Sequence, residues 1–221
     1  MKNTNILSFT DVAKADSNDN NEALVDVRTY NASIRAVYEK SDMIPYTGNS
    51  IFVRDTLAKK LAVIETEFSR IGYSMQVVYG YRHPEIQEKY FEKRKQILRL
   101  KNPTASEIEL DELTHRFVAV PSVAGHPTGG AVDVTLVKTD GAFVDMGTKI
   151  ADFSDVEKIE TFAKDLTPTQ VENRRILRDA MIKEELAPFY GEWWHFSYGD
   201  REWATFYGKS SSLYAPIDFK R

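Results

Sequence analysis

Two histidines, an aspartate and a glutamate stand in short motifs that could hold a metal ion and move a proton. His126 and Asp133 open and close the run His-Pro-Thr-Gly-Gly-Ala-Val-Asp, and Glu192 and His195 frame Glu-Trp-Trp-His. Two imidazoles and one carboxylate are the protein ligands of an open catalytic zinc site, whose fourth position takes water. One carboxylate is then left over as a general base. The two motifs together indicate metal-assisted hydrolysis.

The first motif has a backbone that can turn sharply beside its histidine. Glycines stand at positions 125, 129 and 130, so the chain can bend tightly and leave room next to His126. Asp133 follows at a strand position, and a turn leading into a strand could aim both side chains at one metal ion. The alternative is a loop histidine and a solvent-facing aspartate.

The second motif requires an irregular backbone. In a regular strand Glu192 and His195 would face opposite sides, so we expect a turn or bulge at residues 191–193. A glutamate placed in this way could take a proton from water beside the metal and pass it to a leaving amine. The alternative is that Trp193 and Trp194 are core residues and Glu192 is a solvated residue at the rim.

Arg82 is a third candidate, because it follows a predicted strand that ends near Tyr81. Its guanidinium could hold a substrate carbonyl or carboxylate and stabilise an oxyanion; the alternative is an ordinary pair with a surface carboxylate. His83 and His115 have no partner pattern, so roles at the surface or beside the ligands are expected rather than metal ligation.

Hydrophobic patterning predicts the elements that must bring these residues together. Strands are expected over residues 23–27, 73–81, 116–121 and 131–137, and helices from Pro84, over 155–166 and from Thr167, where Thr-Pro-Thr-Gln has capping-box spacing. A further helix, closed by Gly72, is marked by an apolar stripe of Leu57, Leu61, Ile64, Phe68 and Ile71. Helices flanking a small, mostly antiparallel sheet give an α+β fold class.

Length and composition set further bounds. The 221 residues suit one domain over 23–221, preceded by a polar stretch, 1–22, that is typical of a flexible arm. A net charge of −4 argues against a nucleic-acid partner, and no apolar run reaches the roughly 18 residues of a membrane span. The absence of cysteine excludes disulfides and thiolate ligands. No secretory signal is visible, so the expected compartment is the cytoplasm.

Several segments resemble, in the same order, the VanX-type D-alanyl-D-alanine dipeptidases. These enzymes belong to a zinc peptidase superfamily with DD-carboxypeptidases, lysostaphin-like enzymes and the hedgehog signalling domain. The matching segments cover the chain from about residue 23 to about 198 and are Leu24-Val25-Asp26-Val27, Gly80-Tyr81-Arg82, the His-x-x-Gly-x-Ala-x-Asp-x-Thr-Leu run from His126, Met146-Gly147-Thr148, Asn173-Arg174-Arg175 and Glu192-Trp193-Trp194-His195.

The resemblance implies a hedgehog/DD-peptidase-like fold and a role for each candidate residue. One Zn²⁺ per chain would be bound by His126, Asp133 and His195. Glu192 would be the general base and then the acid toward the leaving amine, and Arg82 would stabilise the tetrahedral intermediate. The implied substrate is free D-Ala-D-Ala in a small pocket, with Asp152 near its amino end.

The chain departs from the family pattern at the expected pocket walls. Ala124 stands where the family usually has serine, and His83 follows Arg82 where the family goes straight to proline. Substrate identity is therefore less fixed than reaction type. A zinc DD- or LD-carboxypeptidase acting on longer peptidoglycan stem peptides is one alternative, and a non-catalytic zinc-binding interaction domain is another. Vancomycin resistance, dipeptide scavenging and cell-wall recycling are all compatible roles.

Overall fold

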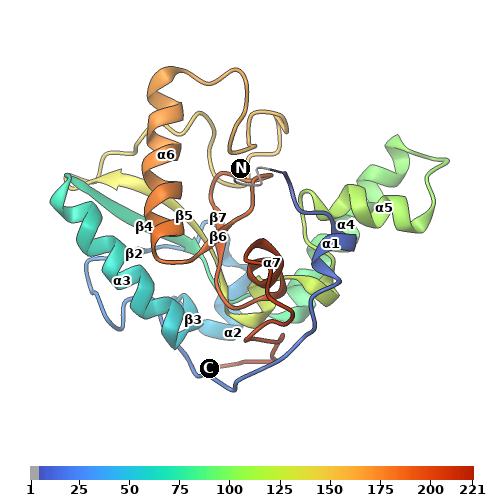
Figure 1. Ribbon diagram of the computed structural model, residues 1–221, viewed down its shortest axis with the longest axis horizontal. Coiled ribbons are helices and arrows are strands. Elements are labelled where there is room, and N and C mark those ends of the chain that lie inside the picture. The colour runs from blue at the N-terminus through green and yellow to red at the C-terminus, as the bar shows by residue number, and fades with distance from the viewer. Residues whose placement is uncertain (1–4) are drawn as a thin grey trace.

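A mixed, mostly antiparallel five-stranded sheet lies at the centre of the computed structural model, which describes residues 5–221 (Figure 1). In spatial order its strands are β2 (Arg35–Ala36), β4 (Tyr73–Tyr79), β5 (Ala131–Lys138), β7 (His195–Ser197) and β6 (Ala187–Pro188). Only the β2–β4 pair is parallel. A separate antiparallel pair is formed by β1 (Leu24–Asp26) and β3 (Phe52–Arg54). The predicted α+β class is confirmed.

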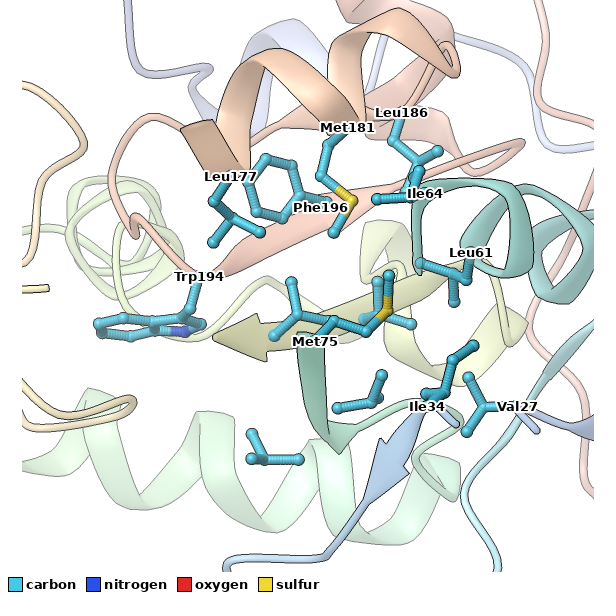
Figure 2. Close-up of a cluster of buried hydrophobic side chains, with 14 of the residues drawn as sticks. Val27, Ile34, Leu61, Ile64, Met75, Leu177, Met181, Leu186, Trp194 and Phe196 are labelled. Atoms are coloured by element: carbon cyan, nitrogen blue, oxygen red, sulfur yellow. The ribbon is translucent and has the colours of Figure 1, made fainter. Parts of the chain in front are cut away.

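Two helices, α3 (Asp55–Arg70) and α6 (Pro168–Lys183), pack their apolar sides against the main core. Figure 2 shows Leu61 and Leu177, from the two helices, close to Met75 of β4 and Phe196 of β7. The Thr167 capping box predicted from the sequence starts α6, and Gly72 follows α3 with a φ of +81°. Side chains alternate across a strand, so Asp133 points to the other side of β5 from Val132 and Val134.

A helical hairpin of α4 (Pro84–Lys101) and α5 (Glu107–His115) projects from the body of the molecule (Figure 1). Pro84 occupies the first turn of α4, as predicted. Near its start, α4 packs against two short 3₁₀ turns, η2 (Pro121–Val123) and η3 (His126–Thr128).

Residues 5–22 pack along the C-terminal part of the chain, which differs from the flexible arm expected for 1–22. They carry α1 (Phe9–Val12), whose Val12 is fully buried, and the Asn20 amide donates to the Leu213 carbonyl at 2.9 Å. Asp19 pairs with the buried Arg54 at 2.9 Å. The polar residues that suggested an arm therefore serve as hydrogen-bonding groups. Residues 1–4 of that stretch lie outside the described part. The remaining short elements are η1 (Ser41–Met43), α2 (Ile44–Thr47) and α7 (Arg201–Phe206).

Two sequence predictions of local structure are wrong. The segment 155–166 forms turns rather than a helix, because its carbonyls at Lys158 and Glu160 accept hydrogen bonds from the buried Arg174 instead of from the next helical turn. The segment 116–121 is not a strand, because the amides of Phe117 and Val118 continue the last turn of α5 by donating to the Thr114 carbonyl.

Candidate metal centre and active site

Three predicted ligands meet at one buried point. The antiparallel register of β5 and β7 places Asp133 directly opposite His195, and η3 brings His126 to the same place. His126 Nε2 lies 3.3 Å from Asp133 Oδ2, and His195 Nδ1 lies 3.0 Å from Asp133 Oδ1. All three residues are buried, and one ligand atom from each lies within 4.8 Å of the other two. The group is consistent with a bound metal ion.

The main chain fixes the orientation of His126. Its Nδ1 lies 2.8 Å from the carbonyl oxygen of Gly80, just after β4. A carbonyl can only accept, so Nδ1 carries the proton and Nε2 presents its lone pair toward Asp133. A β-bulge where β4 pairs with β5 places Tyr79 opposite Asp133, and the Tyr79 ring packs edge-on against His126 with centroids 5.5 Å apart.

Burial and mutual charge set the protonation of the triad. Burial raises the pKa of the Asp133 carboxyl, but the charge of His126 and the hydrogen bonds to both histidines outweigh this and hold its pKa well below the usual range. Burial lowers the pKa of His126 to about 4. For His195 the burial effect is also downward, but the bond to Asp133 and the nearby Glu202 raise its pKa to about 9. An ionised carboxylate and a neutral imidazole are thus already in place, which fits a divalent cation with mixed nitrogen and oxygen ligands.

Glu192 reaches the same site through the turn predicted at 191–193. The Glu192 amide donates to the Phe189 carbonyl at 3.0 Å, and the His195 amide donates to the Glu192 carbonyl at 3.2 Å. This tight turn brings the side chains of Glu192 and His195 into one cavity. Both tryptophans between them are buried in the core, as the alternative interpretation expected, but Glu192 is buried in the cavity and is not a solvated residue at the rim. Burial raises the pKa of Glu192 to about 8, and a cation at the triad would oppose that rise.

Arg82 lies in the cavity rather than in a surface ion pair. Its backbone amide donates to the His126 carbonyl at 3.1 Å, and its Nη1 donates to Gln87 Oε1 at 2.8 Å. The guanidinium sits over the ring of Tyr79, 4.4 Å from the centroid, and its Nε is buried without a hydrogen-bond partner. An unpartnered donor in the lining of the cavity is free to bind an oxygen atom of a ligand.

The cavity has a volume of about 270 Å³. Its lining includes the three triad residues, Glu192 and Arg82, together with Gln87, Tyr90 and Arg94 of α4, His115, Phe117, Ala124, Phe153 and Glu202. Of the two sequence departures, Ala124 lies in the wall and His83 does not. The His83 ring stacks on Tyr46 with centroids 4.1 Å apart, and its Nε2 lies 2.9 Å from Asp218 Oδ1.

Asp152 is not brought to the triad. Its neighbours Ala151 and Phe153 line the cavity, whereas its own carboxylate accepts a hydrogen bond from Ser154 at 2.6 Å.

Sequence reasoning missed two groups in the wall, the buried Glu202 and the partly buried Arg94. Glu202 stands in the first turn of α7, where an acidic residue is usually an exposed complement to the helix dipole; here burial raises its pKa. Arg94 looked like one of many charged residues on α4. The Asp200 N-cap that starts α7 was a readable signal for the position of Glu202, although not for its burial.

Comparison with known proteins decides the family. A family model described as D-ala-D-ala dipeptidase matches residues 24–212. The chain belongs to the D-Ala-D-Ala dipeptidase family. This family is one of M15 metallopeptidases, and the matched range includes the three triad residues, Glu192 and Arg82.

Two relatives carry the same description. A D-alanyl-D-alanine dipeptidase of Enterococcus faecalis is 28% identical over 179 residues, which is 73% of this chain and 80% of that protein. One from Synechocystis sp. is 34% identical over 94 residues, and this match covers only 38% of either chain.

Solved structures of related peptidases resemble the chain more loosely. The vancomycin resistance D,D-pentapeptidase VanY in complex with Zn(II) is 18% identical, with a TM-score of 0.44 over 75% of this chain and 83% of that one. The LD-carboxypeptidase LdcB is 16% identical, with a TM-score of 0.47 over 86% of this chain and 77% of that one. Within residues 5–221, no helix has the length and apolar character needed to cross a membrane.

Proposed function

We propose that this member of the D-Ala-D-Ala dipeptidase family is a zinc-dependent dipeptidase that hydrolyses free D-Ala-D-Ala, with Glu192 as its general base. The observation that carries the proposal is the enclosure of Glu192, Arg82 and the His126–Asp133–His195 triad in one cavity. A metal-binding module without catalysis has no need of a buried carboxyl and a guanidinium with a buried, unpartnered Nε in the cavity that holds its ligands.

The residues divide the reaction between them. Zinc, when bound by the triad, would acidify water and polarise the peptide carbonyl. The Glu192 carboxylate accepts the proton of the attacking water, and the resulting carboxylic acid gives that proton to the leaving amine. Arg82 donates to the carbonyl oxygen as negative charge develops on it, and its position is already held by Gln87 and by the ring of Tyr79.

The size of the cavity supports a short substrate. Small-molecule sites usually occupy about 300–1,000 Å³, and the cavity here, at about 270 Å³, lies just below that range. A dipeptide suits such a volume better than a peptidoglycan stem peptide.

The direct test is release of D-alanine from D-Ala-D-Ala by zinc-loaded protein. A chelated sample and the Glu192→Gln variant should both be inactive, while Glu88→Gln, which changes an exposed glutamate of α4, should keep full activity. Tri- and pentapeptides ending in D-Ala-D-Ala should be poor substrates. Preference for the longer peptides would mean that the protein is a carboxypeptidase. Zinc binding without any hydrolysis would mean that it is a non-catalytic zinc-binding domain.

A further inference from the structure

Arg94 of α4 is an arginine without a partner in the wall of the active-site cavity. Its Nε is buried and makes no hydrogen bond, and no ion pair within residues 5–221 includes it. Its neighbours on the same helix behave differently, since Lys95 and Arg99 both pair with Glu107 of α5. The charge of Glu192 acts on it, but no carboxylate forms an ion pair with it. A partly buried guanidinium without a directly paired carboxylate is costly, which indicates that its hydrogen-bonding partner comes from outside the chain.

Two aromatic rings hold the Arg94 guanidinium in place. Its Cζ lies 4.0 Å from the centroid of Phe117 and 5.3 Å from that of Phe153. Rings against the faces of a guanidinium exclude water and leave the N–H edge free to donate. That edge is the part of arginine that binds a carboxylate with two parallel hydrogen bonds.

Arg94 lies on the face of α4 that lines the cavity. Gln87, Tyr90 and Arg94 follow one another at three and four residues and share this face. The seven residues from Gln87, which contacts Arg82, to Arg94 span about 10 Å. Long helical side chains lean back toward the helix N-terminus, so the Arg94 guanidinium lies nearer to Gln87 than that. The separation is comparable to the roughly 7 Å that two extended residues cover.

The cavity carries charges of both signs. Its carboxylates Asp133, Glu192 and Glu202 all act on His195 and so gather near the triad. Arg82 acts on His126, and Glu192 acts on Arg94 as well. The negative end of a small peptide would be attracted by the arginines and repelled by the carboxylates around the triad.

We propose that Arg94 binds the free C-terminal carboxylate of the substrate, so that the cavity selects peptides that end one residue beyond the scissile bond. The inference rests on the proposed dipeptidase function and names the residue that recognises the C-terminal end of the substrate. Ala124, in the same wall, offers no side-chain donor to that carboxylate.

The test compares D-Ala-D-Ala with D-Ala-D-alaninamide, which differs only in the charge of its C-terminus. Calorimetric titration uses zinc-loaded Glu192→Gln protein, in which the peptide is not cleaved. The free acid should bind about 10- to 100-fold more tightly than the amide. Adding Arg94→Gln should abolish that preference, Arg94→Lys should keep part of it, and Arg99→Gln, on the same helix outside the cavity, should leave it unchanged.

Hydrolysis by proteins with Glu192 intact separates this proposal from the proposed function. Arg94→Gln should raise KM for the free acid by a similar factor and change kcat little. Hydrolysis of D-Ala-D-Ala by a protein that binds the free acid no more tightly than the amide would support the dipeptidase function and contradict the role proposed for Arg94. The opposite result is tighter binding of the free acid that Arg94→Gln removes, with no hydrolysis by the unsubstituted protein. It would support the role of Arg94 and contradict the dipeptidase function. A fall in kcat alone, equal for both peptides, would show that Arg94 acts through Glu192 and would overturn the carboxylate assignment.

Discussion

His126 Nδ1 lies 2.8 Å from the carbonyl oxygen of Gly80, so one main-chain group at the end of β4 selects the tautomer of a metal ligand. Partners of this kind orient the ligating imidazole, and their loss typically lowers metal affinity by about 10- to 100-fold. The oxygen belongs to the backbone, so it can be displaced only by moving the strand end itself.

The substitution Gly80→Ala should displace the carbonyl oxygen that accepts the hydrogen bond from His126. A Cβ at position 80 would meet the Phe52 carbonyl oxygen at 2.5 Å and Ile51 Cγ2 at 2.7 Å, so the backbone must shift. We expect weaker zinc binding, by about 10-fold or more, in a competition assay with a chromophoric chelator. Gly72→Ala is the control, because its φ of +81° makes it strained although nothing lies within 4 Å. That variant should lose stability and keep its zinc affinity. Equal affinities in the Gly80→Ala variant and the unsubstituted protein would show that the Gly80 contact does not orient the ligand.

Arg82→Gln should slow turnover without releasing zinc. Loss of one donor to a developing oxyanion typically costs about 100- to 1,000-fold in kcat. The backbone bond from residue 82 to the His126 carbonyl survives the substitution, so metal content measured by atomic emission should stay at one ion per chain. The exposed Arg70→Gln serves as the matched control. A change confined to KM would assign Arg82 to substrate binding instead.

Zinc binding should release protons. The pKa of His195 is raised to about 9 in its bond with Asp133, so at pH 7 the imidazole holds a proton that a metal ion must displace. Affinity should therefore rise with pH up to about 9. Calorimetry in buffers of different ionisation enthalpy should report at least one proton released per zinc at pH 7, with a further contribution from Glu192, whose pKa of about 8 a bound cation lowers. Binding that is independent of the buffer would mean that His195 is already neutral.

His115 should make the protein sensitive to acid. Burial lowers its pKa from 6.5 to about 4, and its Nδ1 accepts a hydrogen bond from the Val120 amide at 3.3 Å. The unfolded chain binds the proton more readily, so this contribution to stability is complete above pH 6.5 and declines as the pH falls toward 4. The difference in unfolding free energy between pH 7.5 and pH 4 should be smaller by up to about 3 kcal/mol in His115→Gln. Urea titrations at the two pH values measure it, and parallel losses in both proteins would contradict the assignment.

Arg174→Met should loosen one wall of the cavity. The buried Arg174 donates to the carbonyls of Met146, Lys158 and Glu160, and thereby holds the segment that carries Phe153 into the site. Leaving these carbonyls without donors should cost about 2–5 kcal/mol of unfolding free energy. Amide hydrogen exchange should rise over residues 146–160. The exposed Arg175→Met, one position away, should change neither quantity by a measurable amount.

Periodic segments could be predicted from the sequence, whereas segments held by long-range contacts could not. The α3 stripe and the alternation in β5 are local patterns, and both elements formed where they were expected. Ile71 is the exception in its stripe: it is the C-cap of α3 and is exposed. The segment 155–166 was predicted wrongly because its hydrogen-bond donor, Arg174, comes from a different element.

The candidate site divides in the same way. His126, Asp133, Glu192 and His195 could be found because each pair lies within eight residues and carries its own turn. Glu202 and Arg94 could not, because their significance arises from burial and from missing partners, which depend on how α7 and α4 pack. Their residue types alone are typical of a solvated helix surface.

The metal ligands lie on the sheet and its adjoining turn, while Gln87, Tyr90 and Arg94 project from a helix that belongs to a protruding hairpin. Reactivity and selectivity are thus encoded in separate stretches of the gene. A substitution on the face of α4 that lines the cavity should change the substrate preference of the enzyme and leave its metal ligands and Glu192 unchanged. This helix is accordingly the region to randomise when peptides with other C-terminal groups are sought as substrates.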